Sequence, residues 1–330
     1  MMKIIKFTFL IIIASVVIFS CRPDDDSGGA IELADRNEQQ IEDSAELIEF
    51  LNTHFYNYED FDFMNPESAA NDTFQMTFGK IEGANADKIP LSSQVETRTI
   101  TYFDTEYTYY VLKLREGGGK EYTNADAVSL TYRGQLVEDL STFDFKLTQQ
   151  LIGLVSSIKG FQVGLDEFRT AEDIVEGSGG FLNARNGGIG AIFFPSGLGY
   201  YGLFQPGIPV YSELIFSFNV FDAIYQDDDN DGILSSLEDI DGDNDVTNDD
   251  TDSDGNPNFA DFDDDGDGTL TINEIVQNTY VLNPGDLEPV LAANEVEQTR
   301  ETDDDGVTTI STVVFTDTDG DGTPDYLDAN

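Results

Sequence analysis

Aspartates that alternate with other residues are the groups in this sequence best suited to chemistry, and they lie after Gln226. Within twelve-residue segments they take the first, third and fifth positions, with glycine at the sixth and Asp or Glu at the twelfth. Ca²⁺ takes about six to eight oxygen ligands, and a sharp glycine turn lets neighbouring carboxylates converge. The spacing therefore predicts structural calcium sites. The predicted ligands are Asp227, Asp229, Asp231, Glu238, Asp250, Asp252, Asp254, Asp261, Asp263, Asp265, Asp267, Glu274, Asp317, Asp319, Asp321 and Asp328.

This spacing resembles EF-hand-like and thrombospondin type-3 calcium loops. An EF-hand needs a helix before its loop, but residues 214–224 have the alternating pattern of a strand. We therefore expect isolated calcium loops, not paired EF-hands, in the acidic tail (residues 227–330). The alternative is an acidic solvated linker without bound ions, which the four glycines in register disfavour.

The overall charge excludes one class of partner. The chain of 330 residues has a net charge of -49, with 16 Lys and Arg against 65 Asp and Glu. Such a surface repels phosphate, so nucleic acid is excluded as a partner. Arg300 is the only basic residue after Tyr225, so we expect the acidic tail to attract cations.

The single cysteine, Cys21, ends an apolar run that follows Lys3 and Lys6. The run is too short for a comfortable transmembrane helix and predicts a lipoprotein signal over residues 1–20, with Cys21 acylated. The alternative is an ordinary signal peptide with an incidental cysteine. Residues 21–36 then form a tether, and the protein is anchored to a membrane, which we expect to be the outer membrane of a Gram-negative bacterium. The lone histidine, His54, is expected to be a surface or packed residue.

Six short motifs follow one another between residues 107 and 225. They are Tyr132-Arg133-Gly134, Phe143-Asp144, Ser157-Ile158-Lys159-Gly160-Phe161, Leu198-Gly199-Tyr200, Ile208-Pro209 and Leu214-Ile215-Phe216. Their order resembles that of the FKBP family of peptidyl-prolyl isomerases. The resemblance implies an α+β fold in which a twisted antiparallel sheet wraps on one short helix, here over residues 158–168. It also implies a pocket between helix and sheet that binds proline-containing polypeptides without a cofactor.

The chemistry of prolyl isomerisation agrees with these residue types. Rotation about the amide has a barrier of about 18–20 kcal/mol, and its twisted transition state is less polar than the planar amide. A dry aromatic pocket therefore favours the transition state without a nucleophile or a metal. The Ile158 N–H and the Tyr200 hydroxyl are expected to hold substrate carbonyls, and Asp144 to add a polar contact. The predicted site comprises Tyr132, Phe143, Asp144, Ile158, Phe161, Tyr200, Ile208 and Phe216.

Two functional interpretations follow. The first is a membrane-anchored isomerase that assists the folding of exported proteins. The second is a calcium-stiffened surface adhesin or peptide-binding protein in which the isomerase fold is only a scaffold. A separate structural alternative to the pocket is that these aromatic residues are simply core.

Other elements position these groups. Apolar residues at helical spacing predict a helix over residues 37–55 whose apolar face packs on the rest of the chain. Residues 56–100 have no clear period and are expected to be irregular structure with short strands, and residues 101–226 are expected to form the isomerase domain. Strands are predicted over residues 108–114, 127–132 and 214–221. The helical face consists of Ile41, Ala45, Ile48, Leu51 and Phe55.

A glycine-rich insertion over residues 170–190 is predicted to be a mobile loop. No Lys-Ser or Lys-Thr pair follows its glycines, so it is not a phosphate cradle. The glycines are Gly177, Gly179, Gly180, Gly187, Gly188 and Gly190.

Overall fold

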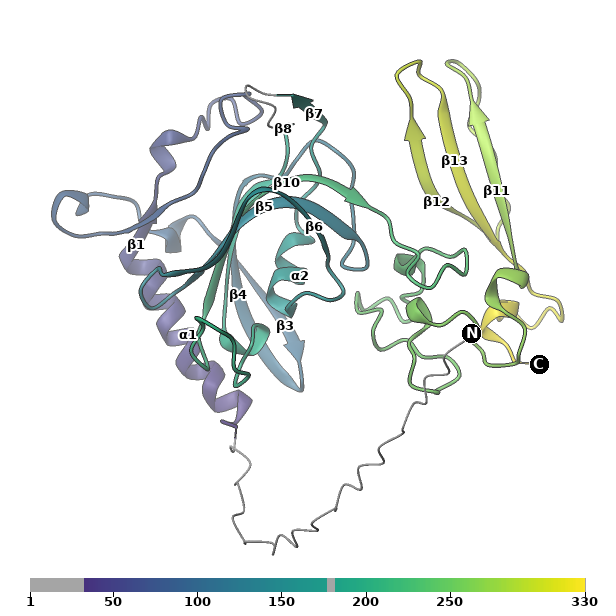
Figure 1. Cartoon of the computed structure of the whole chain (residues 1–330), viewed down its shortest axis with the longest axis horizontal. Helices are drawn as coiled ribbons and strands as arrows, with labels where there is room; N and C mark the ends of the chain where they lie inside the picture. Colours follow the sequence, from purple (N-terminus) through teal and green to yellow (C-terminus); the bar gives the residue numbers. More distant parts are fainter. Residues whose placement is uncertain (1–32, 177–181, 330) are drawn as a thin grey trace, which may run out of the picture. The chain divides into compact units, whose positions relative to one another are not determined.

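The computed structural model describes residues 33–176 and 182–329 and has an α+β fold (Figure 1). Its largest element is a six-stranded antiparallel sheet in the order β3-β4-β9-β10-β5-β6. The three predicted strands are confirmed, and each is longer than predicted. The strands of this sheet are β3 (Glu96–Tyr102), β4 (Thr105–Arg115), β5 (Ala127–Leu136), β6 (Thr142–Gly153), β9 (Ile189–Phe194) and β10 (Leu214–Ile224).

Two α-helices and several short elements accompany this sheet. The helices are α1 (Arg36–Thr53) and α2 (Lys159–Leu165), and two short strand pairs are β1 (His54–Tyr56) with β2 (Phe78–Lys80) and β7 (Asp173–Glu176) with β8 (Leu182–Arg185). The 3-10 turns are Tyr58–Asp60, Gly83–Asn85, Leu91–Ser93, Ser196–Leu198, Ser235–Leu237, Asn258–Ala260, Thr271–Asn273 and Asp325–Leu327.

The sheet is covered on both faces, as strand β9 illustrates. All six residues of β9 are buried, and successive side chains of a strand point to opposite faces. Ala191 and Phe193 pack into a core with α1, whereas Ile192 and Phe194 pack into a second core with α2. The sheet therefore wraps on the short helix α2, as predicted, and α1 covers the opposite face (Figure 1).

The buried face of α1 is not the predicted apolar stripe. Ile41 is 71% exposed and Ile48 is 48% exposed. Leu47, Phe50 and Leu51 are buried in contact with the sheet, and of these only Leu51 belongs to the predicted stripe. The prediction was correct that the helix packs on its own chain and that Leu51 is buried, but wrong for Ile41, Ala45 and Ile48, which are exposed.

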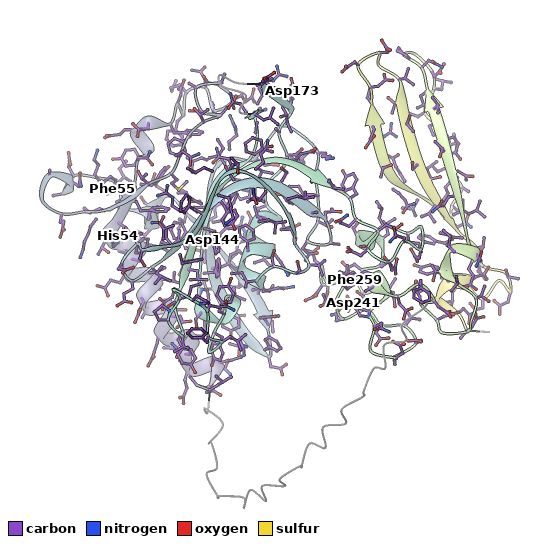
Figure 2. The ribbon with its side chains drawn as sticks, in the orientation of Figure 1. His54, Phe55, Asp144, Asp173, Asp241 and Phe259 are labelled. Atoms are coloured by element: carbon purple, nitrogen blue, oxygen red, sulfur yellow. The ribbon has the colours of Figure 1, made fainter. Side chains whose placement is uncertain are left out.

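A buried carboxylate accounts for this orientation. Asp43 of α1 is fully buried, and its Oδ2 accepts hydrogen bonds from the Ser196 N–H (2.8 Å) and hydroxyl (2.6 Å). Burial nevertheless raises the pKa of Asp43. Because a buried carboxylate must be hydrogen-bonded, these contacts outweigh the apolar pattern. They also fix the start of the segment that carries Tyr200. His54, which follows α1, stacks on Phe50 and is a packed residue, as expected (Figure 2).

The glycine-rich insertion is not simply a loop. Strands β7 and β8 pair as a hairpin within it, and Gly177, Gly179 and Gly180 lie outside the described residues. Gly190 belongs to β9, where an added Cβ would lie 2.4 Å from the Phe168 ring. This glycine therefore serves close packing, and the prediction of a mobile loop was wrong for it.

The acidic tail contains a second sheet, which the sequence analysis did not predict. Its strands are β11 (Ile275–Leu282), β12 (Glu295–Thr302) and β13 (Thr308–Phe315), in the antiparallel order β11-β13-β12. A small core of Ile233, Ile275, Val313 and Tyr326 joins the acidic loops to this sheet. Strand β10, not a helix, precedes the first loop, as predicted.

The expected signal segment, Cys21 and most of the expected tether lie outside the described residues. None of the helices within residues 33–176 and 182–329 has the length and apolar character needed to cross a membrane.

A buried ion pair joins the segment before β3 to the sheet, and it gives a stability prediction. Arg115 Nη1 on β4 lies 2.9 Å from Asp72 Oδ1, and both side chains are 4% exposed. Asp72→Asn leaves the buried guanidinium without its counter-charge, so it should lower the free energy of unfolding by about 3–5 kcal/mol. Chemical denaturation measures this change. As a control, Glu116→Gln removes one of the two exposed carboxylates that pair with Arg169 and should change the free energy by less than about 1 kcal/mol. Equal effects of the two substitutions would contradict the prediction.

Candidate functional site

All eight residues predicted for the pocket line one cavity of about 500 Å³. Strands β5, β6 and β10, the start of α2 and the segment before β10 supply its walls. The volume lies within the range of about 300–1,000 Å³ typical of ligand sites. Its lining consists of Tyr132, Phe143, Asp144 (labelled in Figure 2), Ile152, Ser156, Ser157, Ile158, Phe161, Tyr200, Gln205, Pro206, Ile208 and Phe216.

Phe216 of β10 lies at the centre of an aromatic cluster. Its ring centroid is 4.9 Å from that of Phe161, 5.6 Å from that of Phe143 and 6.0 Å from that of Tyr132. These separations and the tilted or edge-on arrangements are those that aromatic pairs prefer. The cluster gives the cavity an apolar floor.

Two features of β5 and β6 bring Phe143 into this cluster. The β5–β6 pairing shifts register between Gly134 and Gln135, so the consecutive residues Phe143 and Asp144 both reach the cavity. Gly134 leaves room for the ring, because an added Cβ there would lie 2.6 Å from it. The glycine of the first motif is therefore required by packing.

Asp144 is held in place by two donors. The Tyr132 hydroxyl donates to Asp144 Oδ2 at 2.6 Å, and Lys146 Nζ donates to Oδ1 at 2.8 Å. Burial by itself raises the pKa of Asp144, but the hydrogen bonds from Lys146 and Tyr132 outweigh it and hold the pKa below its usual value. Burial and the hydrogen bond to Asp144 raise the pKa of Tyr132. At neutral pH the pair is therefore a carboxylate and a neutral phenol.

The two groups predicted to hold substrate carbonyls are available at the cavity. Ile158 is the residue that precedes α2, and its N–H has no acceptor among the residues that the structure describes. The Tyr200 hydroxyl likewise makes no hydrogen bond to a described residue, and burial raises its pKa. Both groups can therefore donate to a bound peptide.

The neighbouring Tyr201 does not line the cavity. Its hydroxyl donates to the Ala34 carbonyl, and the Arg36 guanidinium lies 4.3 Å from its ring centroid. Tyr201 therefore contacts the beginning of α1, whereas Tyr200 lines the cavity.

The four predicted acidic loops share one backbone geometry. In each loop the N–H of the sixth-position glycine donates to the first-position carboxylate, at 3.0–3.4 Å. The N–H at the fifth position donates to the third-position carboxylate, at 2.9–3.2 Å. A left-handed backbone favours glycine, so the repeated spacing corresponds to a repeated turn. The φ angles of Gly232, Gly255, Gly268 and Gly322 are 99°, 101°, 94° and 103°.

The carboxylates converge within each predicted set, although not all of them take part. Oxygens within 4.8 Å of one another, an arrangement that could hold a metal ion, come from the first, third and fifth positions of three loops. The twelfth residues Asp261, Glu274 and Asp328 are not in these groups. In the first loop Asp229, Asp231 and Glu238 come together, and Asp227 does not belong to the group. The three groups are Asp250 with Asp252 and Asp254, Asp263 with Asp265 and Asp267, and Asp317 with Asp319 and Asp321.

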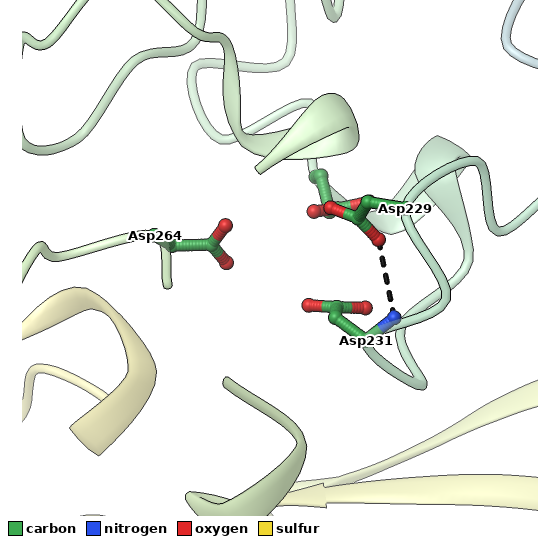
Figure 3. A group of neighbouring side chains, drawn as sticks. Asp229, Asp231 and Asp264 are labelled. Carbon is green, nitrogen blue, oxygen red and sulfur yellow. Dashed lines mark hydrogen bonds between the residues drawn. The ribbon is translucent and has the colours of Figure 1, made fainter. Parts of the chain in front are cut away.

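The structure adds two features that the sequence analysis missed. Asp239, Asp241 (labelled in Figure 2) and Asp249 form a further group, and Asn244, with φ 67°, takes the place of the sixth-position glycine. The Asp-x-Asp-x-Asp spacing was visible there, but the glycine was absent. The second feature is Asp264, which joins the carboxylates of the first loop although it belongs to the third (Figure 3).

The first-loop group has the strongest electrostatic strain. Burial, together with neighbouring carboxylates, raises the pKa of Glu238 to about 10, that of Asp264 to about 8 and that of Asp231 to about 7. Desolvation and like charge both disfavour the ionised form, and a bound cation would reverse both effects.

Comparison with known proteins gives one family match. A family described as BamM C-terminal matches residues 228–292, which contain the first predicted loop without Asp227, the second and third loops, and β11. No curated protein matches the chain.

Several solved structures with similar regions bear the names of isomerases or immunophilins. A peptidyl-prolyl cis-trans isomerase from Pseudomonas syringae is 20% identical, with 35% of this chain and 74% of that chain covered and a TM-score of 0.29. FkpA from Escherichia coli is 23% identical, with 38% and 51% covered and a TM-score of 0.29. A multi-domain immunophilin from Arabidopsis thaliana is 13% identical, with 42% and 49% covered and a TM-score of 0.29. These matches span about half of the last two proteins, so the functional proposal rests on the geometry of the pocket.

Proposed function

We propose that the protein is an FKBP-type peptidyl-prolyl cis-trans isomerase that assists the folding of exported proteins. The observation that carries the proposal is the convergence of Tyr132, Phe143, Asp144, Ile158, Phe161, Tyr200, Ile208 and Phe216 on one aromatic cavity. These residues come from separate strands, a helix and a loop.

The cavity suits a proline ring whose preceding peptide bond is rotating between cis and trans. The rings around Phe216 offer an apolar floor, where a twisted amide loses less solvation than a planar, more polar one. The Ile158 N–H and the Tyr200 hydroxyl lie at the cavity and hold the carbonyls on either side of the proline. The Asp144 carboxylate, fixed by Tyr132 and Lys146, adds a polar contact at the rim.

A protease-coupled assay with peptides that carry an apolar residue before proline tests this function. The purified chain should accelerate isomerisation above the uncatalysed rate, which takes tens to hundreds of seconds. An uncatalysed rate combined with saturable peptide binding would favour the alternative of an adhesin or peptide-binding protein on an inactive scaffold. Neither turnover nor binding would overturn the pocket assignment.

We further propose that the cations of the acidic tail are calcium ions. The groups described above offer only oxygen ligands, which calcium prefers, and the repeated turn brings at least three carboxylates together. For an extracellular protein we expect the exposed groups to bind weakly, with dissociation constants on the order of 10⁻⁴–10⁻³ M.

Membrane attachment through Cys21 belongs to the same proposal and gives a direct prediction. Cys21→Ala removes the only thiol of the chain, so the protein should move from the detergent phase to the aqueous phase without unfolding. Detergent partitioning and circular dichroism measure the two properties. Ser27→Ala, in the same tether, is the matched control and should remain in the detergent phase. Equal partitioning of wild type and Cys21→Ala into water would exclude the lipid anchor.

A further inference from the structure

Four carboxylates from two different loops converge on one point in the acidic tail. Asp229, Asp231 and Glu238 belong to the first loop, and Asp264 belongs to the third. Their oxygens lie within 4.8 Å of one another, and Asp264 faces Asp229 and Asp231 from the other side of the space between them (Figure 3). Asp264 occupies the second position of its own loop, so it is not one of the carboxylates that converge there.

Three of the four side chains are buried, and most of the carboxylate oxygens lack a partner. Glu238 is 0% exposed, and Asp231 and Asp264 are each 1% exposed. Among the described residues, neither carboxylate oxygen of Glu238 or of Asp264 has a hydrogen-bond partner, and neither does Asp231 Oδ2. A buried carboxylate without a partner costs several kcal/mol, and four adjacent ones repel one another. A bound cation would compensate both costs.

We propose that Asp229, Asp231, Glu238 and Asp264 form a single Ca²⁺ site shared by the first and third loops, and that it is the tightest calcium site of the tail. The inference rests on the proposal that the tail binds calcium, and it adds a ligand that no loop pattern supplies. Four carboxylates offer as many as eight oxygens, which matches calcium, whereas magnesium demands a smaller octahedral shell and retains its waters.

Burial and charge distinguish this site from the others. Asp317, Asp319 and Asp321 are exposed and supply three carboxylates, and solvent and salt screen their attraction for a cation. The shared site supplies four carboxylates in buried surroundings, where the same attraction is stronger. Calcium affinity rises with the number of charged ligands and the rigidity of the site.

The shared ion also organises the tail. The Gly232 carbonyl of the first loop accepts hydrogen bonds from Gln277 Nε2 (3.0 Å) and Gln298 Nε2 (3.1 Å) of the second sheet. An ion held between the first and third loops therefore fastens both loops to that sheet. The tail core, with four buried residues and a few partly buried ones, is too small to stabilise such a segment alone, so the binding free energy of the ion becomes folding free energy.

Calcium titration by calorimetry of the full-length chain in detergent, with variants of both loops, tests the shared site. Asp264→Asn should weaken the tightest class of sites at least about tenfold and leave the weaker classes unchanged. Glu238→Gln, in the other loop, should have the same effect. The double variant should weaken the same class of sites and leave the other classes unchanged, because both substitutions act on one site. Asp228→Asn, at the second position of the first loop and outside the group, is the matched control and should bind as wild type does.

The outcomes separate this inference from the proposal on which it rests. If wild type takes up no calcium, the calcium proposal fails and the shared site fails with it. If wild type binds calcium but Asp264→Asn gives the same isotherm, or if Asp264→Asn and Glu238→Gln weaken two different classes of sites, only the shared site is overturned. Thermal unfolding in the presence of chelator excludes a folding defect, because Asp264→Asn should melt there at the wild-type temperature or above it.

Discussion

Phe216→Ala should lower kcat/KM for prolyl isomerisation by about 10–100-fold. Phe216 contacts the other rings of the cavity floor, and burial of a Phe side chain contributes about 1.5–3 kcal/mol. About 1.4 kcal/mol of lost transition-state stabilisation corresponds to a tenfold loss in rate. The protease-coupled assay measures the loss.

The control for this substitution lies on the same strand. Phe216→Ala also removes a buried ring and should destabilise the fold by about 3–5 kcal/mol. Phe218, two residues along β10, is 2% exposed and packs on Phe168, but it does not line the cavity. Phe218→Ala should therefore destabilise the protein to a similar extent and retain kcat/KM where circular dichroism shows that it is folded. Equal losses of activity would mean that stability, not the pocket, explains the result.

Tyr200→Phe refines the same prediction. It removes one hydroxyl that has no partner among the described residues, so the fold should be unaffected. Loss of one hydrogen bond of about 0.5–1.5 kcal/mol should lower kcat/KM by roughly two- to tenfold. An unchanged rate would remove the Tyr200 hydroxyl from the proposed mechanism.

Removal of calcium should expand the acidic tail and leave the six-stranded sheet folded. The tail is held by a small core of Ile233, Ile275, Val313 and Tyr326 with a few partly buried apolar residues around it, while its acidic loops place like charges close together. Without a cation the repulsion is uncompensated, so the loops should open and the second sheet should lose its anchorage. The large core around α2 and the core under α1 do not depend on these carboxylates.

Hydrodynamic radius and calorimetry with calcium, magnesium and chelator measure this change. Calcium should compact the chain, whereas magnesium should do so poorly. Calcium uptake without compaction, or no uptake, would reduce the tail to a solvating linker.

Isomerase activity provides an internal control for the chelation experiment. Lys159, which follows Ile158, pairs with Asp245 of the tail at 2.8 Å. Every lining residue of the cavity, however, precedes the tail. We therefore expect chelation to change kcat/KM by less than about tenfold, the equivalent of 1.4 kcal/mol.

The pocket was the region of the molecule most open to prediction from the sequence. Tyr132, Phe143, Ile158 and Phe216 fall in short motifs whose order carries the family resemblance, and the structure brings them to one cavity with the other predicted residues. Their catalytic role stays a prediction. The register shift that admits both Phe143 and Asp144 is not visible in the sequence, because it depends on how β5 and β6 pair.

Contacts between distant segments account for what the sequence could not predict. The orientation of α1 depends on the hydrogen bonds between Asp43 and Ser196, which no helical period reveals. Asp264 is at the second position of the third loop, which the calcium-loop pattern does not mark as a ligand. Only the approach of the first and third loops brings it to Asp229, Asp231 and Glu238. The second sheet was more accessible, since Ile275–Leu282 and Thr308–Phe315 are rich in β-branched residues, but the surrounding aspartates dominated the interpretation.

The second sheet also has a mechanical consequence. Ile275 of β11 pairs directly with Phe315 of β13, so the two ends of the segment that forms this sheet lie next to each other. A tension applied between the two ends of the chain would therefore be carried by the Ile275–Phe315 pair and not by residues 276–314, until that pair separates. The residue pairs between β11 and β13 would then open one after another. Residues 276–314 would be released and would extend by roughly 130–140 Å, at about 3.3–3.6 Å per residue. Residues 276–314 would thus lengthen the chain under a tension that they share, in series, with the six-stranded sheet.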